Sequence, residues 1–157
     1  MKILFVPNLI VSSLTDKDRV NILEAAGPGA RIVEVKGNEA QRRELPDTDI
    51  IFGRVHADNF HLAKQIVYYH SIGAGVDNIL TPELINHAVP LASEKGDVGI
   101  HLAEHAFALL LGLTRGVHTA IRTPDYELRE PIRVHQRELY DTTMGIVGFG
   151  GTGRAVA

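Results

Sequence analysis

The chain has 157 residues, of which 45% are hydrophobic and 22% charged, and its formal net charge at pH 7 is −3. This length is about that of one domain, so a complete two-domain enzyme hardly fits within it. The weak acidic balance, without a block rich in lysine and arginine, argues against a nucleic-acid partner, and the lack of cysteine excludes disulfides, thiolate zinc sites and cysteine nucleophiles.

Two hydrophobic segments bear on the location of the protein. Met1 is followed at once by the strand-like residues 2–6, which are too short for a signal-peptide core and lack a small-residue cleavage site. The most apolar run, residues 106–113, is far shorter than the roughly 20 residues that a membrane span needs. We therefore expect a soluble, cytoplasmic protein with no membrane partner.

Short apolar segments that alternate with helical patterns predict the fold class. Most of these segments are continuous apolar runs, as expected of parallel strands buried on both faces. The six predicted strands are residues 2–6, 31–35, 49–53, 66–71, 89–92 and 144–148. Strands that alternate with helices predict an α/β fold with a doubly wound parallel sheet.

Capping signals mark two of the helices. Thr15 precedes Asp18 by three residues, which predicts a capping box at the start of a helix that ends near residues 27–29, Gly-Pro-Gly. Farther along, Thr81 before Pro82 predicts an N-cap with proline at the first helical position.

The fourth predicted strand leads into a loop, residues 72–78, with the sequence I-G-A-G-V-D-N. Ligands of open α/β sheets bind beyond the carboxyl ends of the strands. Gly73 and Gly75 flank Ala74 and let consecutive backbone N–H groups turn toward one spot, which predicts an anion-binding nest for a carboxylate or a phosphate. An ordinary tight turn, with Asp77 or Asn78 capping the segment that follows, accounts for the same residues.

Residues 100–121 predict one long helix. Its stretch 106–113 is apolar all round, so we expect it to be buried on nearly every side, as it would be between two layers or two domains. Residues 123–125, Thr-Pro-Asp, predict the end of this helix. The charged, proline-interrupted segment 126–140 predicts a surface connection.

The same helix contains an alternative motif. His101, Glu104 and His105 form H-x-x-E-H, the pattern of an inverted zinc-protease site, and histidines four residues apart share a helix face. No downstream motif marks a third ligand, so a zinc hydrolase stays an alternative and the main interpretation includes no metal. An FMN-binding flavodoxin is not expected, because residues 7–11 after the first strand are too apolar for its phosphate loop.

The last predicted strand runs into G-x-G-x-x-G at residues 148–153. Gly148 permits the tight turn, Gly150 lets the backbone approach a pyrophosphate, and Gly153 allows close packing of a helix on the strand. The following helix would offer N–H groups and the positive end of its dipole. This pattern predicts a dinucleotide-binding loop; a glycine-rich tail without a ligand is the alternative.

The position of this motif in the chain leads to a further expectation. Only four residues follow Gly153, whereas a dinucleotide-binding βαβ unit needs about 30 residues and an acidic residue about 20 positions farther on for the ribose. We therefore expect the chain to be a truncated piece of a longer protein and to be inactive by itself.

Three motifs, at residues 72–78, 102–115 and 144–154, occur in an order and spacing that resemble the N-terminal portion of the D-isomer-specific 2-hydroxyacid dehydrogenases. The resemblance covers about residues 49–157. This chain departs from the usual family pattern at residues 151–152, where Gly-Thr replaces a basic–aliphatic pair, and at residues 141–142, where Asp-Thr replaces Gly-Lys.

The resemblance implies a domain organisation and a set of site residues. The implied domains are a flavodoxin-like substrate domain over residues 1–99, an interdomain helix over 100–122 and the beginning of a Rossmann NAD(P)-binding domain over 123–157. The backbone amides of Ala74 and Gly75 would hold the substrate carboxylate, with Arg54 facing the cleft. The residues that would line the cofactor pyrophosphate are Gly148, Gly150, Gly153, Arg154 and Ala155.

The family's reaction is hydride transfer between the nicotinamide of NAD or NADP and C2 of a small D-2-hydroxy or 2-keto acid. In the family an arginine orients the substrate, and a histidine with a carboxylate partner moves the proton. These catalytic residues are expected beyond Ala157, and the family implies a homodimer for the full-length protein. A non-catalytic nucleotide-sensing or corepressor-like binding module is the alternative function.

Overall fold

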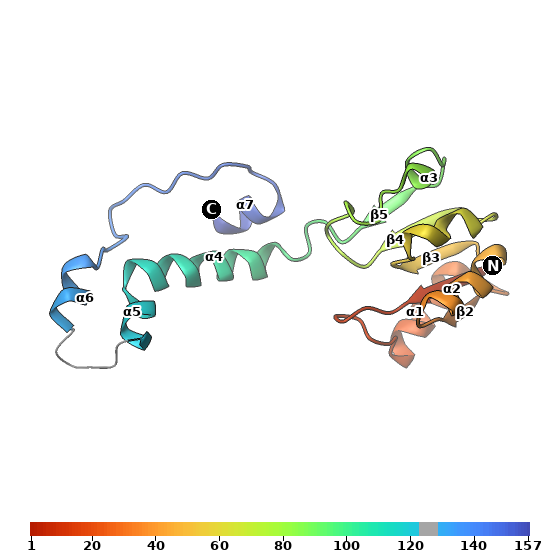
Figure 1. The fold of residues 1–157 in the computed structure, drawn as a ribbon, viewed down its shortest axis with the longest axis horizontal. Coiled ribbons are helices and arrows are strands. Elements are labelled where there is room, and N and C mark those ends of the chain that lie inside the picture. The colour runs from red at the N-terminus through yellow and green to blue at the C-terminus, as the bar shows by residue number, and fades with distance from the viewer. Residues whose placement is uncertain (123–128) are drawn as a thin grey trace. The chain divides into compact units, whose positions relative to one another are not determined.

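The computed structural model describes residues 1–122 and 129–157. The chain divides into two compact units, Met1–Lys95 and Gly96–Ala157 (Figure 1).

The first unit is built on a five-stranded sheet in which all strands are parallel and the order is β2-β1-β3-β4-β5. This is the flavodoxin-like order of a doubly wound sheet, so the predicted fold class is confirmed. The strands are β1 (Lys2–Val6), β2 (Arg31–Glu34), β3 (Ile50–Gly53), β4 (Tyr68–Ser71) and β5 (Leu91–Ser93). Five of the six predicted strands are therefore present, with ends that differ by up to two residues.

The helical segments of the first unit connect consecutive strands of this sheet (Figure 1). They are α1 (Asp16–Ala26), α2 (Asn38–Glu44), the 3₁₀ turns η1 (Leu45–Asp47) and η2 (Ala57–Leu62), and α3 (Pro82–Ile85). The predicted capping box is confirmed: the N–H of Asp18 donates to the Thr15 hydroxyl at 3.2 Å, and the N–H of Thr15 donates to the Asp18 carboxylate at 3.0 Å. The Thr81 cap of α3 is confirmed as well.

Strand β1 lies between β2 and β3, and all five of its residues are buried. Its first residue, Lys2, is a buried cation whose Nζ lies 3.0 Å from Oε2 of Glu44, donates to the Glu44 carbonyl at 2.7 Å and also pairs with Asp47. This network ties the start of β1 to the end of α2 and to η1. It also gives the buried lysine the charged partners that it needs.

The second unit consists of helices and extended chain. The helices are α4 (Gly99–Thr114), α5 (Val117–Arg122), α6 (Arg129–His135) and α7 (Gly151–Val156), and α7 packs on α4 (Figure 1). No helix in the described part of the chain is long and apolar enough to cross a membrane.

The prediction of one helix over residues 100–121 is wrong. The helix ends at Thr114, and α5 starts after Gly116, whose φ of +66° is left-handed and incompatible with a continuing α-helix. The predicted burial is also wrong, because Leu109 is 57% and Leu113 67% exposed. An all-apolar helix is covered only if neighbours surround it, and the short α7 covers one part of α4.

Two further predictions for this unit need correction. Residues 144–148 form no strand, and Val147 is fully exposed. A strand needs a neighbour for its backbone N–H and C=O groups, and the described residues of the second unit contain no other strand that could pair with it. The segment 126–140, expected to be a surface connection, contains α6, and the predicted helix end at 123–125 lies outside the described residues.

Candidate functional site

The carboxyl ends of β1 and β3 meet at one edge of the sheet, at the point where the strand order reverses. This is the place where doubly wound sheets bind ligands. A cavity of about 410 Å³ opens there, lined by the last residue of β1, by the loops that follow β1, β2 and β3, and by helix α2. The polar side chains are Asn8, Ser12, Lys36, Gln41 and Arg54.

Gly53 allows β1 and β3 to converge at this edge. Its φ is +127°, a value that side-chain-bearing residues rarely adopt. A Cβ on Gly53 would overlap the carbonyl oxygen of Val6 and lie 2.9 Å from the Val6 carbonyl carbon. The chain therefore turns sharply at Gly53 and places Arg54 at the rim of the cavity.

Two buried side chains hold the loop that carries Arg54. The N–H of Val55 donates to the Tyr69 hydroxyl at 3.2 Å, and the N–H of His56 donates to Oε1 of Gln41 at 2.8 Å. Burial raises the pKa of Tyr69, so its hydroxyl stays protonated at neutral pH. The sequence analysis missed both anchors, since neither residue lies in a motif.

Arg54 lies beside the loop that contains Ala74 and Gly75. Its Nη2 donates to the backbone carbonyl of Asn78 at 3.4 Å, which links Arg54 to the end of the loop that contains two of the residues that the resemblance assigns to the substrate. The N–H groups of Ala74 and Gly75 donate to no acceptor among the described residues and remain free for a ligand. Gly75 is exposed and Ala74 half-buried.

The backbone of this loop differs from the predicted nest in one respect. Neither Gly73 nor Gly75 has a positive φ, so the alternating right- and left-handed conformation of many nests is absent. The space around both glycines is open, since a Cβ built on either residue would lie 3.9 Å from the nearest atom. The free N–H groups can therefore be approached closely.

The glycine motif forms a tight turn that leads into α7. Gly148 has a φ of +94°, and a Cβ on Gly153 would overlap the Gly148 carbonyl oxygen. Gly150 is the N-cap of α7, and no atom lies within 4 Å of the position of its missing Cβ. Gly153 therefore packs directly against the backbone of Gly148 and has no room for a side chain, whereas Gly150 is open to solvent.

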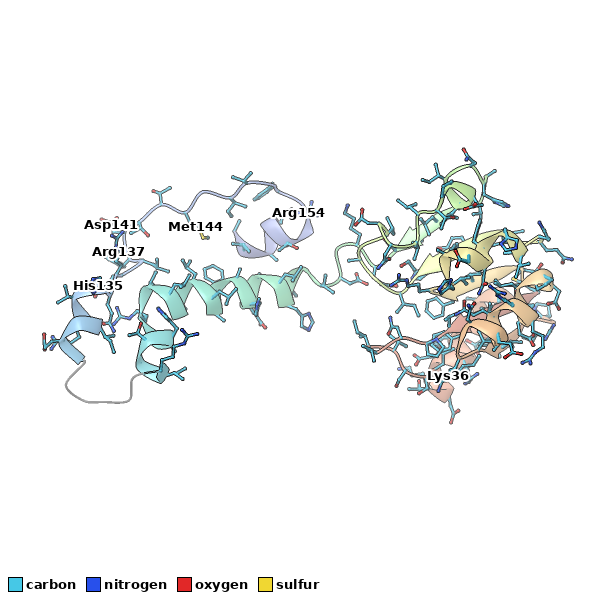
Figure 2. All side chains as sticks on the ribbon, viewed as in Figure 1. Lys36, His135, Arg137, Asp141, Met144 and Arg154 are labelled. Carbon is cyan, nitrogen blue, oxygen red and sulfur yellow. The ribbon has the colours of Figure 1, made fainter. Side chains whose placement is uncertain are left out.

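Of the residues that the resemblance assigns to the pyrophosphate on α7, only Gly153 lies in the first turn, where the N–H groups are free. The N–H of Arg154 donates to the Gly150 carbonyl at 3.0 Å, so Arg154 can offer a ligand its side chain, which is exposed on α7 (Figure 2). Ala155 is likewise within the helix. The unpaired N–H groups of a helix are those of its first turn, here residues 151–153.

The structure explains the unusual glycine at position 151. A Cβ on Gly151 would lie 3.2 Å from Cα of Gly96, and a Cβ on Gly99 would lie 3.1 Å from the Gly151 carbonyl oxygen. The start of α4 and the start of α7 thus pack backbone against backbone. A side chain at position 151 would therefore require the backbone at Gly96 to shift by a few tenths of an ångström.

The H-x-x-E-H motif lies on the first half of α4. His101, Glu104 and His105 are all exposed. In the part of the chain that the structure describes, no group of three or more histidines and carboxylates is arranged to hold a metal ion. The structure therefore adds no third ligand to this motif.

The comparisons with known proteins agree with these motifs, although no family model matches. The chain is 32% identical over 153 residues to a D-3-phosphoglycerate dehydrogenase of Archaeoglobus fulgidus, with 95% of this chain and 29% of the relative covered. It is 31% identical over 172 residues to a glyoxylate reductase of Pyrococcus furiosus, with 96% and 49% covered. The chain thus spans half or less of the length of these curated relatives, which confirm the resemblance seen in the sequence.

Solved structures show the same fold. An NAD-dependent formate dehydrogenase from Staphylococcus aureus in complex with NAD has a TM-score of 0.70 at 24% identity, with 100% of this chain and 52% of that chain covered. A D-mandelate dehydrogenase from Rhodotorula graminis has a TM-score of 0.70 at 16% identity, with 99% and 51% covered.

Proposed function

We infer the function of this chain from the D-isomer-specific 2-hydroxyacid dehydrogenases, the family that its curated relatives represent. The chain contributes the substrate domain and the start of the nucleotide-binding region to an oxidoreductase. That enzyme transfers a hydride between NAD or NADP and C2 of a small D-2-hydroxy or 2-keto acid. The observation that carries this proposal is the match over 95% of the chain to a dehydrogenase of such an acid.

The substrate carboxylate binds at the carboxyl edge of the sheet. The free N–H groups of Ala74 and Gly75 donate to its oxygens, and the neighbouring Arg54 guanidinium supplies positive charge. Tyr69 and Gln41 keep Arg54 in place through the backbone of its loop. These groups bind and orient the acid.

The cofactor pyrophosphate binds at the turn formed by Gly148, Gly150 and Gly153, with Arg154 and Ala155 on the adjoining helix. The open space at Gly150 and the unpaired N–H groups of residues 151–153 fit a phosphate group. When bound, the nicotinamide dinucleotide supplies or accepts the hydride. The acid–base residues of the reaction are expected beyond Ala157, so we propose that residues 1–157 alone do not turn over substrate.

The remaining parts of the proposal concern assembly and location. We propose that the full-length enzyme is a cytoplasmic homodimer whose partners are its small acid substrate and its cofactor. No observation favours the sensor or the zinc hydrolase.

A titration of the protein with NADH, followed by the fluorescence of the nicotinamide, tests the cofactor site. Aspartate and serine are both good N-cap residues, so Gly150→Asp and Gly150→Ser both preserve the start of α7. Gly150→Asp is expected to weaken NADH binding at least about fivefold relative to Gly150→Ser, because like charges a few ångströms apart near a protein surface repel by about 1–4 kcal/mol. Equal dissociation constants for the two variants would contradict the phosphate role.

A further inference from the structure

Asn59 is a polar residue with an exposed fraction of 0%. It lies in η2, the 3₁₀ turn that follows the loop carrying Arg54. A buried amide costs free energy unless its oxygen and its NH₂ group both find hydrogen-bond partners. The Asn59 side chain has partners at both ends, and all of them lie on α2. The polarity of those partners decides which way the amide points.

Two groups of fixed polarity set the orientation of the Asn59 side chain. Nε of Arg42, which can only donate, lies 3.0 Å from Oδ1 of Asn59. The backbone carbonyl of Asn38, which can only accept, lies 3.5 Å from Nδ2 of Asn59, and the Asn38 side-chain oxygen accepts from the same nitrogen. Exchange of the oxygen and the nitrogen of Asn59 would put donor against donor and acceptor against acceptor. The position of the Asn59 NH₂ group is therefore fixed.

The Asn59 NH₂ group in turn orients the side chain of Gln41. Oε1 of Gln41 accepts from Nδ2 of Asn59 at 3.4 Å and from the backbone N–H of His56 at 2.8 Å. Because both of these groups donate, the Gln41 amide keeps its oxygen on the side of η2. Gln41 is only 7% exposed and lines the cavity at the carboxyl edge of the sheet, so its NH₂ group is left for the cavity.

The hydrogen bond from His56 to Gln41 holds the chain two residues beyond Arg54. The Arg54 guanidinium lies 3.4 Å from the carbonyl oxygen of Asn78, which is long for a hydrogen bond. The exposed arginine therefore depends on the backbone of its loop for its position. The backbone N–H of Asn59 also donates to the His56 carbonyl, at 2.9 Å. A residue buried in η2 thus reaches the Arg54 loop through its side chain and through its backbone.

We propose that Asn59 is a positioning residue for substrate binding. It fixes the Gln41 amide with the oxygen toward His56, and this anchors the loop that presents Arg54 to the substrate. The inference rests on the proposed function, in which the Arg54 guanidinium lies beside the bound carboxylate. Asn59 is not among the residues that line the cavity, so it acts on the substrate only through Gln41 and the loop.

The test compares two substitutions that each exchange an amide for a carboxylate. Asn59→Asp keeps the size of the side chain but replaces the NH₂ group by an acceptor, which repels Oε1 of Gln41. Gln41 is then expected to turn its NH₂ group toward the new carboxylate, and the His56 N–H loses its acceptor. Asn38→Asp is the matched control, because it adds the same charge beside Asn59 and keeps an oxygen that accepts from Nδ2 of Asn59.

The first measurement is amide hydrogen exchange in the 157-residue chain. It compares the N–H of His56, which donates to Gln41, with the N–H of Val55, which donates to the Tyr69 hydroxyl. In Asn59→Asp the exchange of His56 relative to Val55 is expected to be about three- to tenfold faster, the size of one lost hydrogen bond. Asn38→Asp is expected to leave this ratio unchanged. A general loss of stability would not change it either, because unfolding exposes both amides.

The second measurement is a titration with D-glycerate, a small 2-hydroxy acid, monitored by the backbone amide NMR signals of Ala74 and Gly75. Asn59→Asp is expected to raise the dissociation constant about three- to tenfold, because the released Arg54 side chain must be ordered on binding. Asn38→Asp is expected to leave the dissociation constant unchanged. This comparison removes the effect of the added charge from the result.

Other results would overturn the role of Asn59. Equal exchange ratios of His56 to Val55 in the two variants would do so, because Asn59 would then not orient Gln41. Equal dissociation constants would also do so and would leave the proposed function intact. If Asn59→Asp does not fold, the exchange of the side-chain NH₂ groups in the unchanged chain decides. The Asn59 group should exchange more slowly than the Gln41 group, and equal rates would contradict the orientation.

The proposed function can fail separately. If D-glycerate shifts neither Ala74 nor Gly75 in the unchanged chain, the proposed carboxylate site is contradicted. The exchange ratio then decides alone: faster exchange of His56 in Asn59→Asp than in Asn38→Asp supports the control of the loop by Asn59, and an equal ratio overturns it.

Discussion

Replacement of Gly53 by alanine tests how the candidate site is built into the sheet. The residue pairs with Val6 across β1 and β3 and has a φ of +127°. An alanine in left-handed backbone costs about 1–2 kcal/mol. The added Cβ would also overlap the Val6 carbonyl oxygen and lie 2.9 Å from its carbon, which forces the strand ends apart at a further cost of about 1–3 kcal/mol.

The expected loss for Gly53→Ala is therefore about 2–5 kcal/mol, a large part of the about 5–15 kcal/mol that stabilises a domain. The control is Gly27→Ala, where φ is +84° and no atom lies within 4 Å of the added Cβ, so it should lose only about 1–2 kcal/mol. Urea unfolding followed by far-UV circular dichroism measures both, since the chain has no tryptophan. Equal losses for the two variants would refute the close approach of β1 to β3.

Three other variants test separate parts of the fold. Thr15→Ala should lower the free energy of unfolding by about 1 kcal/mol, because the α1 cap is removed, and Thr15→Ser should restore it in the same urea assay. Hydrogen bonds from Lys2 hold the pKa values of Glu44 and Asp47 below their ordinary values. These two ion pairs therefore stabilise the folded state fully when the pH is above the ordinary carboxyl pKa values. The stabilisation is lost as the pH falls through the lowered pKa values of the folded state. Urea midpoints measured from about pH 5 to pH 2 should therefore fall less steeply in Lys2→Met; an unchanged slope would contradict this. Gly99→Ala should weaken the packing of α7 on α4, because the added Cβ would lie 3.1 Å from the carbonyl oxygen of Gly151 in α7. The measurement is amide hydrogen exchange, which should be faster in α7 of the variant than in α7 of the unchanged protein.

The sequence patterns succeeded where the deciding interactions are local or repeated along one element. The capping box needs only Thr15 and Asp18, so it is visible within four residues. Strands buried on both faces show continuous apolar runs, so β1 was predicted with its observed ends. The same local logic failed for residues 144–148, which have a strand-like pattern but no strand beside them among the described residues of their unit.

Some residues of the candidate site could likewise be predicted from local sequence, and others could not. Gly73, Ala74 and Gly75 were visible as a loop after a predicted strand, and the glycine motif was visible from its spacing. The anchors Tyr69 and Gln41 were not visible, because they act on Arg54 through contacts that span 14 and 15 residues of sequence.

By itself, the sequence determined the α/β class, the capped helix ends and the glycine turns, because each depends on side chains within a few residues of one another. Tertiary structure decided the strand order, and with it the neighbours of each loop. Lys36 follows β2 and Arg54 follows β3, and the two line one cavity because both strands pair with β1. Strand order depends on which crossovers bury the most apolar surface, a property of the whole chain that no single segment carries.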